Sequence, residues 1–193
     1  MKLTGSYPGL DGSYEILVTP TGTMTVHSSF KYSGAERYAR EIGLGFSLPK
    51  DCDTLHWERN AEWSVYPKDH IGRPIGTTKA VSEHAEKLPP TWPYAEDNTP
   101  MGTNDFRSTK RHIRSAWIGN SALATVGIRS DGKQALRAMV DTDRVCVYVN
   151  DWFGGTNVGW GEWITNYGKG HLIKSGDVLE STVRLSLYRR KED

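Results

Sequence analysis

Side chains suited to holding a sugar gather in the stretch between residues 57 and 73. This stretch combines several aromatic rings with charges of both signs, and it shows neither strand alternation nor helical spacing. We therefore expect a loop here. The C–H face of a pyranose stacks on an aromatic ring, and its hydroxyls need planar donors and acceptors. The candidate carbohydrate-binding residues of this stretch are Trp63, Tyr66, Asp69, His70 and Arg73; alternatively, the rings cover the end of a sheet.

A second aromatic loop is expected at residues 151–170, where tryptophans stand among six glycines. A loop so rich in glycine has little local structure in which to bury large rings. Trp160 and Trp163 are therefore candidates for a platform on which a sugar stacks. The alternative is that both rings fold back onto the body of the protein.

The sequence offers no convincing catalytic or metal-binding set. Hydrolysis of a glycoside with retention needs two carboxylates about 5–5.5 Å apart, and no such pair is evident among Glu58, Glu62 and Glu162. Asp69-His70 lacks the three or four ligands that zinc requires. We expect no cofactor and no metal. His70 with Glu62 is the candidate acid–base couple if the chain is instead a sugar epimerase of the mutarotase type.

Composition favours one β-rich domain and argues against two classes of partner. The 193 residues include seven Trp and nine Tyr, and 37% are hydrophobic. The net charge of +1 gives no field to attract nucleic acid or an anionic membrane. No apolar stretch reaches membrane-spanning length. We therefore predict neither a nucleic-acid nor a membrane partner.

Alternation with a period of two predicts strands along most of the chain. The clearest case is residues 40–48, where Gly43 and Gly45 leave one face bare for another backbone or a ring. Ile113, Ser115 and Trp117 predict a further strand with a charged outer face. We predict an all-β fold, an antiparallel β-sandwich, spanning residues 13–188. Residues 1–12 are expected to form a linker or irregular edge because of their glycines and proline, and residues 189–193 a charged tail.

The two cysteines, Cys52 and Cys146, lie in or beside apolar runs, without metal-ligand spacing. A disulfide between them is possible, but one pair does not establish it. Buried free thiols are the expectation.

A series of short motifs resembles the C-terminal, small-chain domain of β-galactosidase-type enzymes of glycoside hydrolase family 2. That family has an R-I-G-L strand, a Trp-containing strand, a Y-x-D-R loop, a P-x-E-x-G segment and a final Gly-Gly-to-Trp loop. The corresponding segments here follow the same order and together cover roughly residues 13–188: residues 41–48, 54–57, 63–73, 94–108 and 150–163.

The resemblance implies a supersandwich similar to the galactose mutarotase fold. It also implies that the chain is part of a larger enzyme whose two catalytic glutamates lie on a separate barrel domain. The expected role is to pack against that barrel and complete the sugar cleft, with Trp160 or Trp163 reaching the sugar. The isolated chain would then be inactive on glycosides.

Two departures from the family pattern limit what is carried over. The family's Gly-Pro-x-Glu is replaced by a differently spaced run, so Glu62 cannot be equated with that acid. The Glu-x-Gly segment becomes residues 101–104, which contain no glutamate. A stand-alone, lectin-like carbohydrate-binding module therefore remains an alternative. The compartment stays open, with a periplasmic or secreted location favoured over a cytoplasmic one.

Overall fold

The structure, a computed structural model, describes residues 1–39, 41–60, 74–82, 109–120, 124–153 and 171–188. These residues form strands and contain no helix, and therefore none long and apolar enough to cross a membrane. The strands are β1 (Lys2–Tyr7), β2 (Leu10–Val18), β3 (Thr23–Tyr32), β4 (Arg37–Ala39), β5 (Glu41–Pro49), β6 (Thr54–Arg59), β7 (Ile75–Lys79), β8 (Val81–Ser82), β9 (Thr109–Lys110), β10 (Ile113–Asn120), β11 (Ala124–Arg129), β12 (Ala135–Asp141), β13 (Arg144–Phe153), β14 (His171–Ile173) and β15 (Val178–Tyr188).

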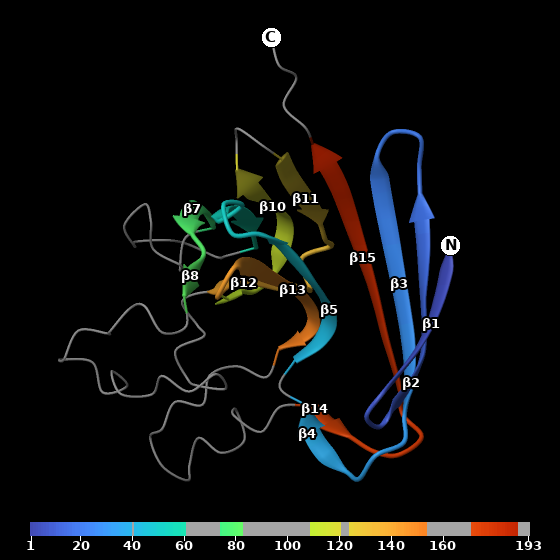
Figure 1. Ribbon diagram of the computed structural model, residues 1–193. Helices are drawn as coiled ribbons and strands as arrows, with labels where there is room; N and C mark the ends of the chain where they lie inside the picture. The colour runs from blue at the N-terminus through green and yellow to red at the C-terminus, as the bar shows by residue number, and fades with distance from the viewer. Residues whose placement is uncertain (40, 61–73, 83–108, 121–123, 154–170, 189–193) are drawn as a thin grey trace, which may run out of the picture.

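The strands build two layers. The larger sheet has the order β1-β2-β3-β15-β11-β10-β6-β7, and the smaller has the order β5-β13-β12-β8, with β9 also paired to β12. Figure 1 shows β5 and β13 facing β15, with the larger sheet curling so that β10 and β11 lie behind the smaller one. A ribbon of β4 and β14 lies at one end. This is the predicted antiparallel β-sandwich; among the described pairings, β8 with β12 is parallel.

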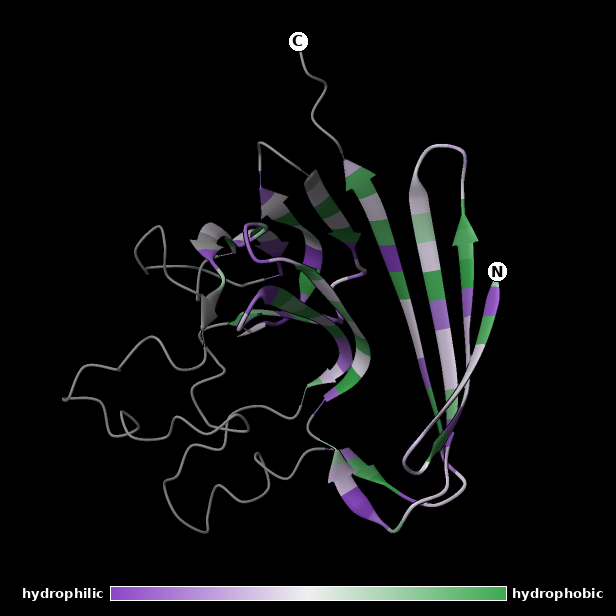
Figure 2. Cartoon of the chain, in the orientation of Figure 1, coloured by the Kyte–Doolittle hydropathy of each residue, from purple (hydrophilic) through white to green (hydrophobic). Residues whose placement is uncertain are grey.

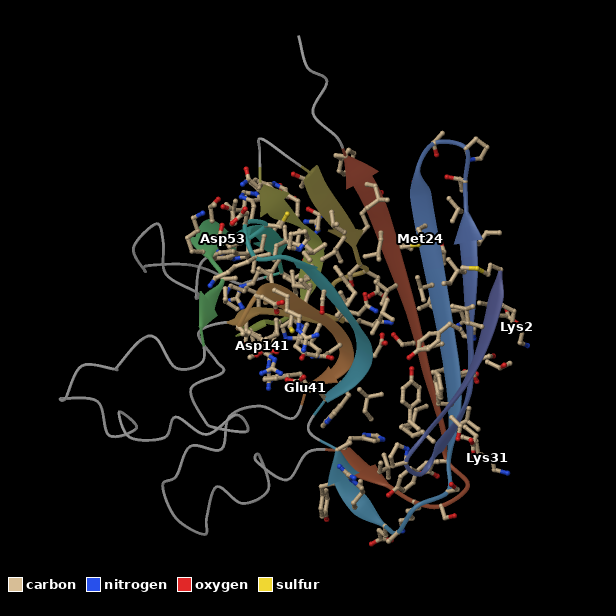
Figure 3. All side chains as sticks on the ribbon, viewed as in Figure 1. Lys2, Met24, Lys31, Glu41, Asp53 and Asp141 are labelled. Carbon is tan, nitrogen blue, oxygen red and sulfur yellow. The ribbon has the colours of Figure 1, made fainter. Side chains whose placement is uncertain are left out.

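The core lies between the layers, where both sheets contribute apolar side chains. Hydrophobic and hydrophilic residues alternate along β3 and β15, as the colour bands of Figure 2 show. The inward residues of both sheets fill the space between them in Figure 3, whereas Lys2 and Lys31 project away from the smaller sheet. The larger fully buried side chains of this core are Leu55, Trp57, Ile113, Ile118, Ile128, Leu136, Val145, Val147, Val149 and Val183.

The N-terminal segment differs from the prediction. Residues 1–12 were expected to be irregular, but β1 pairs with β2 along its whole length. Pro8 and Gly9 form the turn of this hairpin, and Gly9 takes a positive φ of 75°. The proline and glycines therefore mark a hairpin turn and an edge pairing rather than a linker.

The strand at residues 113–120 also differs from the predicted pattern. Its pairing with β6 shifts between Ile113 and Ser115, so Arg114 is an extra residue in a β-bulge. The bulge changes the phase of alternation: Ala116 and Ile118 are buried, while Trp117 faces outward and is 37% exposed. Ile113 and Trp117, predicted to share a face, therefore do not.

Other local predictions are confirmed. Cys52 and Cys146 are both buried free thiols. A Cβ at Gly43 would collide with the backbone of Val149 and Asn150 on β13. At Gly45 it would lie 3.2 Å from the ring of Tyr148. The two bare positions on β5 are thus occupied by a neighbouring backbone and by a ring, respectively.

Candidate functional site: a groove on the outer face of the larger sheet

The candidate sugar-binding residues from the sequence lie outside the described part of the chain, so their roles stay predictions. They are Trp63, Tyr66, Asp69, His70, Arg73, Trp160 and Trp163. Glu62 and Glu162 lie outside it as well. The described strands present a different set of side chains to solvent, and these form a candidate site.

Strand register places two rows of side chains across the outer face of the larger sheet. The first row runs over four neighbouring strands, β6, β10, β11 and β15, and the second, two residues further along, crosses the same strands. The first row is Glu58, Ser115, Arg129 and Arg184, and the second is His56, Trp117, Gly127 and Ser186. Side chains in neighbouring rows on one face lie close enough to act on one ligand.

The second row carries the aromatic end of the site. The Trp117 ring stacks on His56 with centroids 5.2 Å apart and planes 15° from parallel. His56 Nδ1 in turn lies 2.8 Å from the Thr77 hydroxyl oxygen, in hydrogen-bonding distance. On the other side, a Cβ at Gly127 would lie 2.7 Å from the ring of Tyr188. Trp117 and Tyr188 thus flank a bare glycine, and a hollow of about 460 Å³ opens there.

The polar end lies where β11 stops and β15 continues. β11 ends at Arg129, and the chain turns through Asp131 and Gly132, which has a positive φ of 92°. The backbone N–H of Lys133 donates to Asp131 over 3.0 Å, and this hydrogen bond lowers the pKa of the Asp131 carboxyl below its usual value. The backbone edge of β15 before Arg184 therefore lacks β11 as a neighbour, leaving a notch in the sheet.

Gln134 closes the floor of this notch. Its buried amide donates to the backbone carbonyl of Thr182 over 3.1 Å and to Asp151 Oδ1 over 2.9 Å. Asp151 reaches this position because the register of β13 with β5 shifts between Asn150 and Trp152. A bulge of this kind redirects a side chain. The close approach of β13 to Gly43 occurs at the same point, since Gly43 pairs with Asn150.

The two hollows are neighbours that share part of their lining, and we call the two together the outer groove. The notch encloses about 840 Å³ and the aromatic hollow about 460 Å³. Both are lined by Glu58, Ser115 and Arg129. The outer groove thus has an aromatic end, a shared polar centre and a charged end.

A smaller cavity of about 270 Å³ lies between the larger sheet and the β4–β5–β14 region. Its wall includes Tyr7, Tyr14 and Phe30, and the Tyr14 and Phe30 rings meet edge to face at 5.0 Å. Burial, together with the neighbouring Tyr7 hydroxyl, raises the pKa of Tyr14 to about 12. Tyr14 is therefore a neutral phenol at physiological pH and is unsuited to act as a base.

Two glutamates of the outer groove are too far apart to act as a hydrolytic carboxylate pair. Glu58 and Glu180 lie on β6 and β15, which are three strand spacings apart, or about 14 Å in an extended sheet. A hydrolytic carboxylate pair needs about 5–9.5 Å, depending on stereochemistry. Glu58 also accepts a hydrogen bond from Ser115 over 2.9 Å. Among the described residues, no group of three or more His, Cys, Asp or Glu side chains is placed to hold a metal ion.

Sequence reasoning missed the outer groove because its members come from separate strands. Trp117 lay in a predicted strand, but its outward orientation depends on the bulge at Arg114. The available signal was the run of three polar or basic residues, His112, Arg114 and Ser115, around a single apolar position. That run indicates that the strand begins irregularly, but it does not show which strands lie beside it.

Comparison with known proteins adds no family assignment: no protein-family model matches the chain, and a search of curated proteins finds no match.

Proposed function

We propose that this chain is a non-catalytic, carbohydrate-contacting β-sandwich domain of a β-galactosidase-type glycoside hydrolase. A catalytic barrel domain would supply the acids that break the glycosidic bond. The observation that carries the carbohydrate part is the outer groove, in which the exposed Trp117 ring lies beside a polar row.

The groove has the chemistry that a pyranose requires. The Trp117 face is braced by His56, so a sugar ring stacking on it meets a fixed surface. Two residues away, Glu58 accepts, Ser115 both donates and accepts, and Arg129 donates hydrogen bonds. An aromatic surface next to convergent polar groups is the usual composition of a small-molecule site.

The relation to glycoside hydrolases rests on the order of motifs and on the fold. The first two motifs, residues 41–48 and 54–57, lie in β5 and β6 of an all-β sandwich, which fits the resemblance. The remaining motifs lie wholly or partly outside the described residues. A barrel partner and the sugar cleft of the parent enzyme therefore remain part of the proposal.

Titration calorimetry of the chain with neutral galacto- and gluco-oligosaccharides tests this proposal. We expect millimolar or tighter binding that weakens at least about tenfold in Trp117→Ala, because the stacking surface is lost. Trp152→Ala is the matched control, since Trp152 is 42% exposed but lies on β13 and does not line the outer groove. Equal weakening in both variants, or no binding by the parent chain, contradicts the proposal.

A stand-alone binding module is the second candidate, because the outer groove is built from strands of this chain alone. Affinity separates the two. A module that acts independently needs micromolar binding by the isolated chain, whereas a domain that completes a cleft needs only weak binding. In both cases, aryl β-glycosides should show no turnover with the isolated chain.

A further inference from the structure

Three arginines meet at the charged end of the outer groove. Arg129 and Arg184 lie directly opposite each other on β11 and β15. Arg114 is the extra residue of the β10 bulge, and its carbonyl accepts from the N–H of Ser130, the residue after Arg129. All three are exposed and line the notch. We call them the arginine triad.

The carboxylates of the notch have other hydrogen-bond donors. Glu58 accepts from Ser115, and Glu180 accepts from Ser29 over 3.2 Å. Asp131 takes the backbone N–H of Lys133 and lies 3.5 Å from its ammonium group, and Asp151 accepts from Gln134. Within the described part of the chain, no member of the arginine triad forms an ion pair with any of them.

Like charges directly opposite each other on neighbouring strands are unfavourable. The Arg129–Arg184 pair therefore places two positive charges side by side, and an anion held between them would relieve their repulsion. A guanidinium group binds a planar carboxylate through two parallel hydrogen bonds, which makes arginine better suited to this task than lysine.

The aromatic end lies within reach of the triad. Arg129 and Trp117 are on neighbouring strands and two residues apart in register, about 8 Å from strand geometry. A saccharide stacked on Trp117 would thus place its next ring beside Arg129 and Arg184. From this juxtaposition we infer that the outer groove binds an acidic saccharide, with the carboxylate of a hexuronate held by the arginine triad. This inference rests on the carbohydrate-binding function proposed above.

The acids in the notch argue against a densely charged ligand. Asp131, Asp151, Glu58 and Glu180 line the same groove as the triad, so a polymer with an anion at every step would meet repulsion beside each attraction. A hexuronate among neutral hydroxyls presents a single carboxylate to the arginines. Its hydroxyls can donate to the four carboxylates, which are acceptors.

Paired ligands test the inference. Calorimetry would compare a trisaccharide that carries one galacturonate among neutral galactose residues with its methyl ester, which has the same rings without the charge. We expect the acid to bind at least about tenfold more tightly at low ionic strength, with the difference shrinking at 0.5 M salt. Arg129→Gln and Arg184→Gln should each abolish most of this difference, and the lysine replacements at both positions should restore only part of it.

Lys31→Gln is the control for the arginine variants. Lys31 is exposed on the same face of the larger sheet and lies on β3 outside the groove. Its replacement by glutamine removes the same unit of charge as each arginine substitution. It should leave both affinities unchanged. Circular dichroism of each variant checks that the exposed substitutions leave the fold intact.

The outcomes separate the inference from the function on which it rests. Equal affinities for the acid and the ester, with both lost in Trp117→Ala, overturn the hexuronate and retain the carbohydrate function. Binding of neither trisaccharide, together with no binding of neutral oligosaccharides, overturns both. Inorganic sulfate binding as tightly as the acidic trisaccharide overturns the inference, because the triad would then be a simple anion site.

Discussion

Lys110 is a cationic residue within the apolar core. Its side chain is 1% exposed, and its ammonium nitrogen lies 5.0 Å from the centre of the buried Trp57 ring. Burial is the main cause that lowers the Lys110 pKa to about 8, and the nearby charge of Arg59 adds to it. The aromatic face partly compensates the charge, as cation–π contacts do.

The stability contribution of Lys110 should therefore change with pH. In the unfolded chain a lysine keeps a pKa near 10.4, so between pH 8 and about 10.4 the unfolded state binds more protons than the folded state. Stability then rises with pH in this window. The full gain is about 3 kcal/mol above the unfolded pKa, from a difference of roughly two units.

Denaturant unfolding of the parent chain and Lys110→Met at pH 7 to 10.5 measures the pH-dependent contribution of Lys110 to the unfolding free energy. The difference in unfolding free energy between the two proteins should shift in favour of the parent chain as pH rises. Lys31→Met, which removes an exposed lysine on β3 instead of the buried one, is the control. A flat difference for Lys110→Met would mean that the folded protein does not disfavour the charged lysine.

Single residues show what the sequence could and could not predict at this scale. The free, buried state of Cys52 and Cys146 followed from their apolar neighbours. The burial of Lys110 could not be predicted in this way, because a lysine beside Arg111 and His112 is typical of a solvent-exposed face. Its position depends on Trp57, which precedes it by more than fifty residues and meets it only after the sheets pack.

At the scale of elements, two glycines of β5 face different neighbours, so replacing each with alanine should have a different cost. Gly43→Ala would drive a methyl group into the backbone of β13, which cannot move without breaking the ladder. Gly45→Ala on the same strand meets the ring of Tyr148, which can rotate away. We expect a loss of at least about 2 kcal/mol for the first and less than about 1 kcal/mol for the second, by the cost of overpacking.

Thermal unfolding of the two alanine variants measures this difference, and each serves as the control for the other. Because Gly43 faces the bulge that positions Asp151, Gly43→Ala should also weaken the proposed saccharide binding in the outer groove. Equal destabilisation by the two substitutions would show that the backbone of β13 yields as readily as a side chain.

The elements were largely predictable, but their irregularities were not. Alternation located β5, because strands with one buried face follow a period of two. The bulges at Arg114 and Asp151 have no such signature, since each depends on the register of a partner strand. Both contribute to the outer groove, so the part of the fold that sequence patterns missed is the part that forms the candidate site.

At the scale of the whole molecule, β15 holds the larger sheet together. It pairs with β3 on one side and with β11 on the other, although about 150 residues separate β3 from β15 in the sequence. The three N-terminal strands join the rest of the larger sheet through this contact. Pairing of such distant segments carries a large loop-closure cost, so it should form late in folding.

This arrangement predicts that both halves of the larger sheet unfold together. Val183 on β15 is fully buried, and removing two of its methyl groups in Val183→Ala should cost roughly 2 kcal/mol, or about 4–8 °C in Tm. Val18→Ala is the matched control, because Val18 is 64% exposed at the end of β2 and should change stability by less than about 0.5 kcal/mol.

Two probes distinguish the halves. The first tryptophan of the chain is Trp57, so tryptophan fluorescence reports on residues beyond β1, β2 and β3, while hydrogen exchange of amides in β2 and β3 reports on the N-terminal strands. In Val183→Ala both probes should shift by the same free energy, because β15 is shared. If the amides of β2 and β3 open at a lower free energy than the fluorescence transition, the N-terminal strands are a separate cooperative unit. The aromatic hollow of the outer groove is built on β6, β10 and β11 with the end of β15, so the proposed saccharide binding should then survive the opening of β2 and β3. A single shared transition instead requires the proposed binding and the N-terminal strands to be lost together.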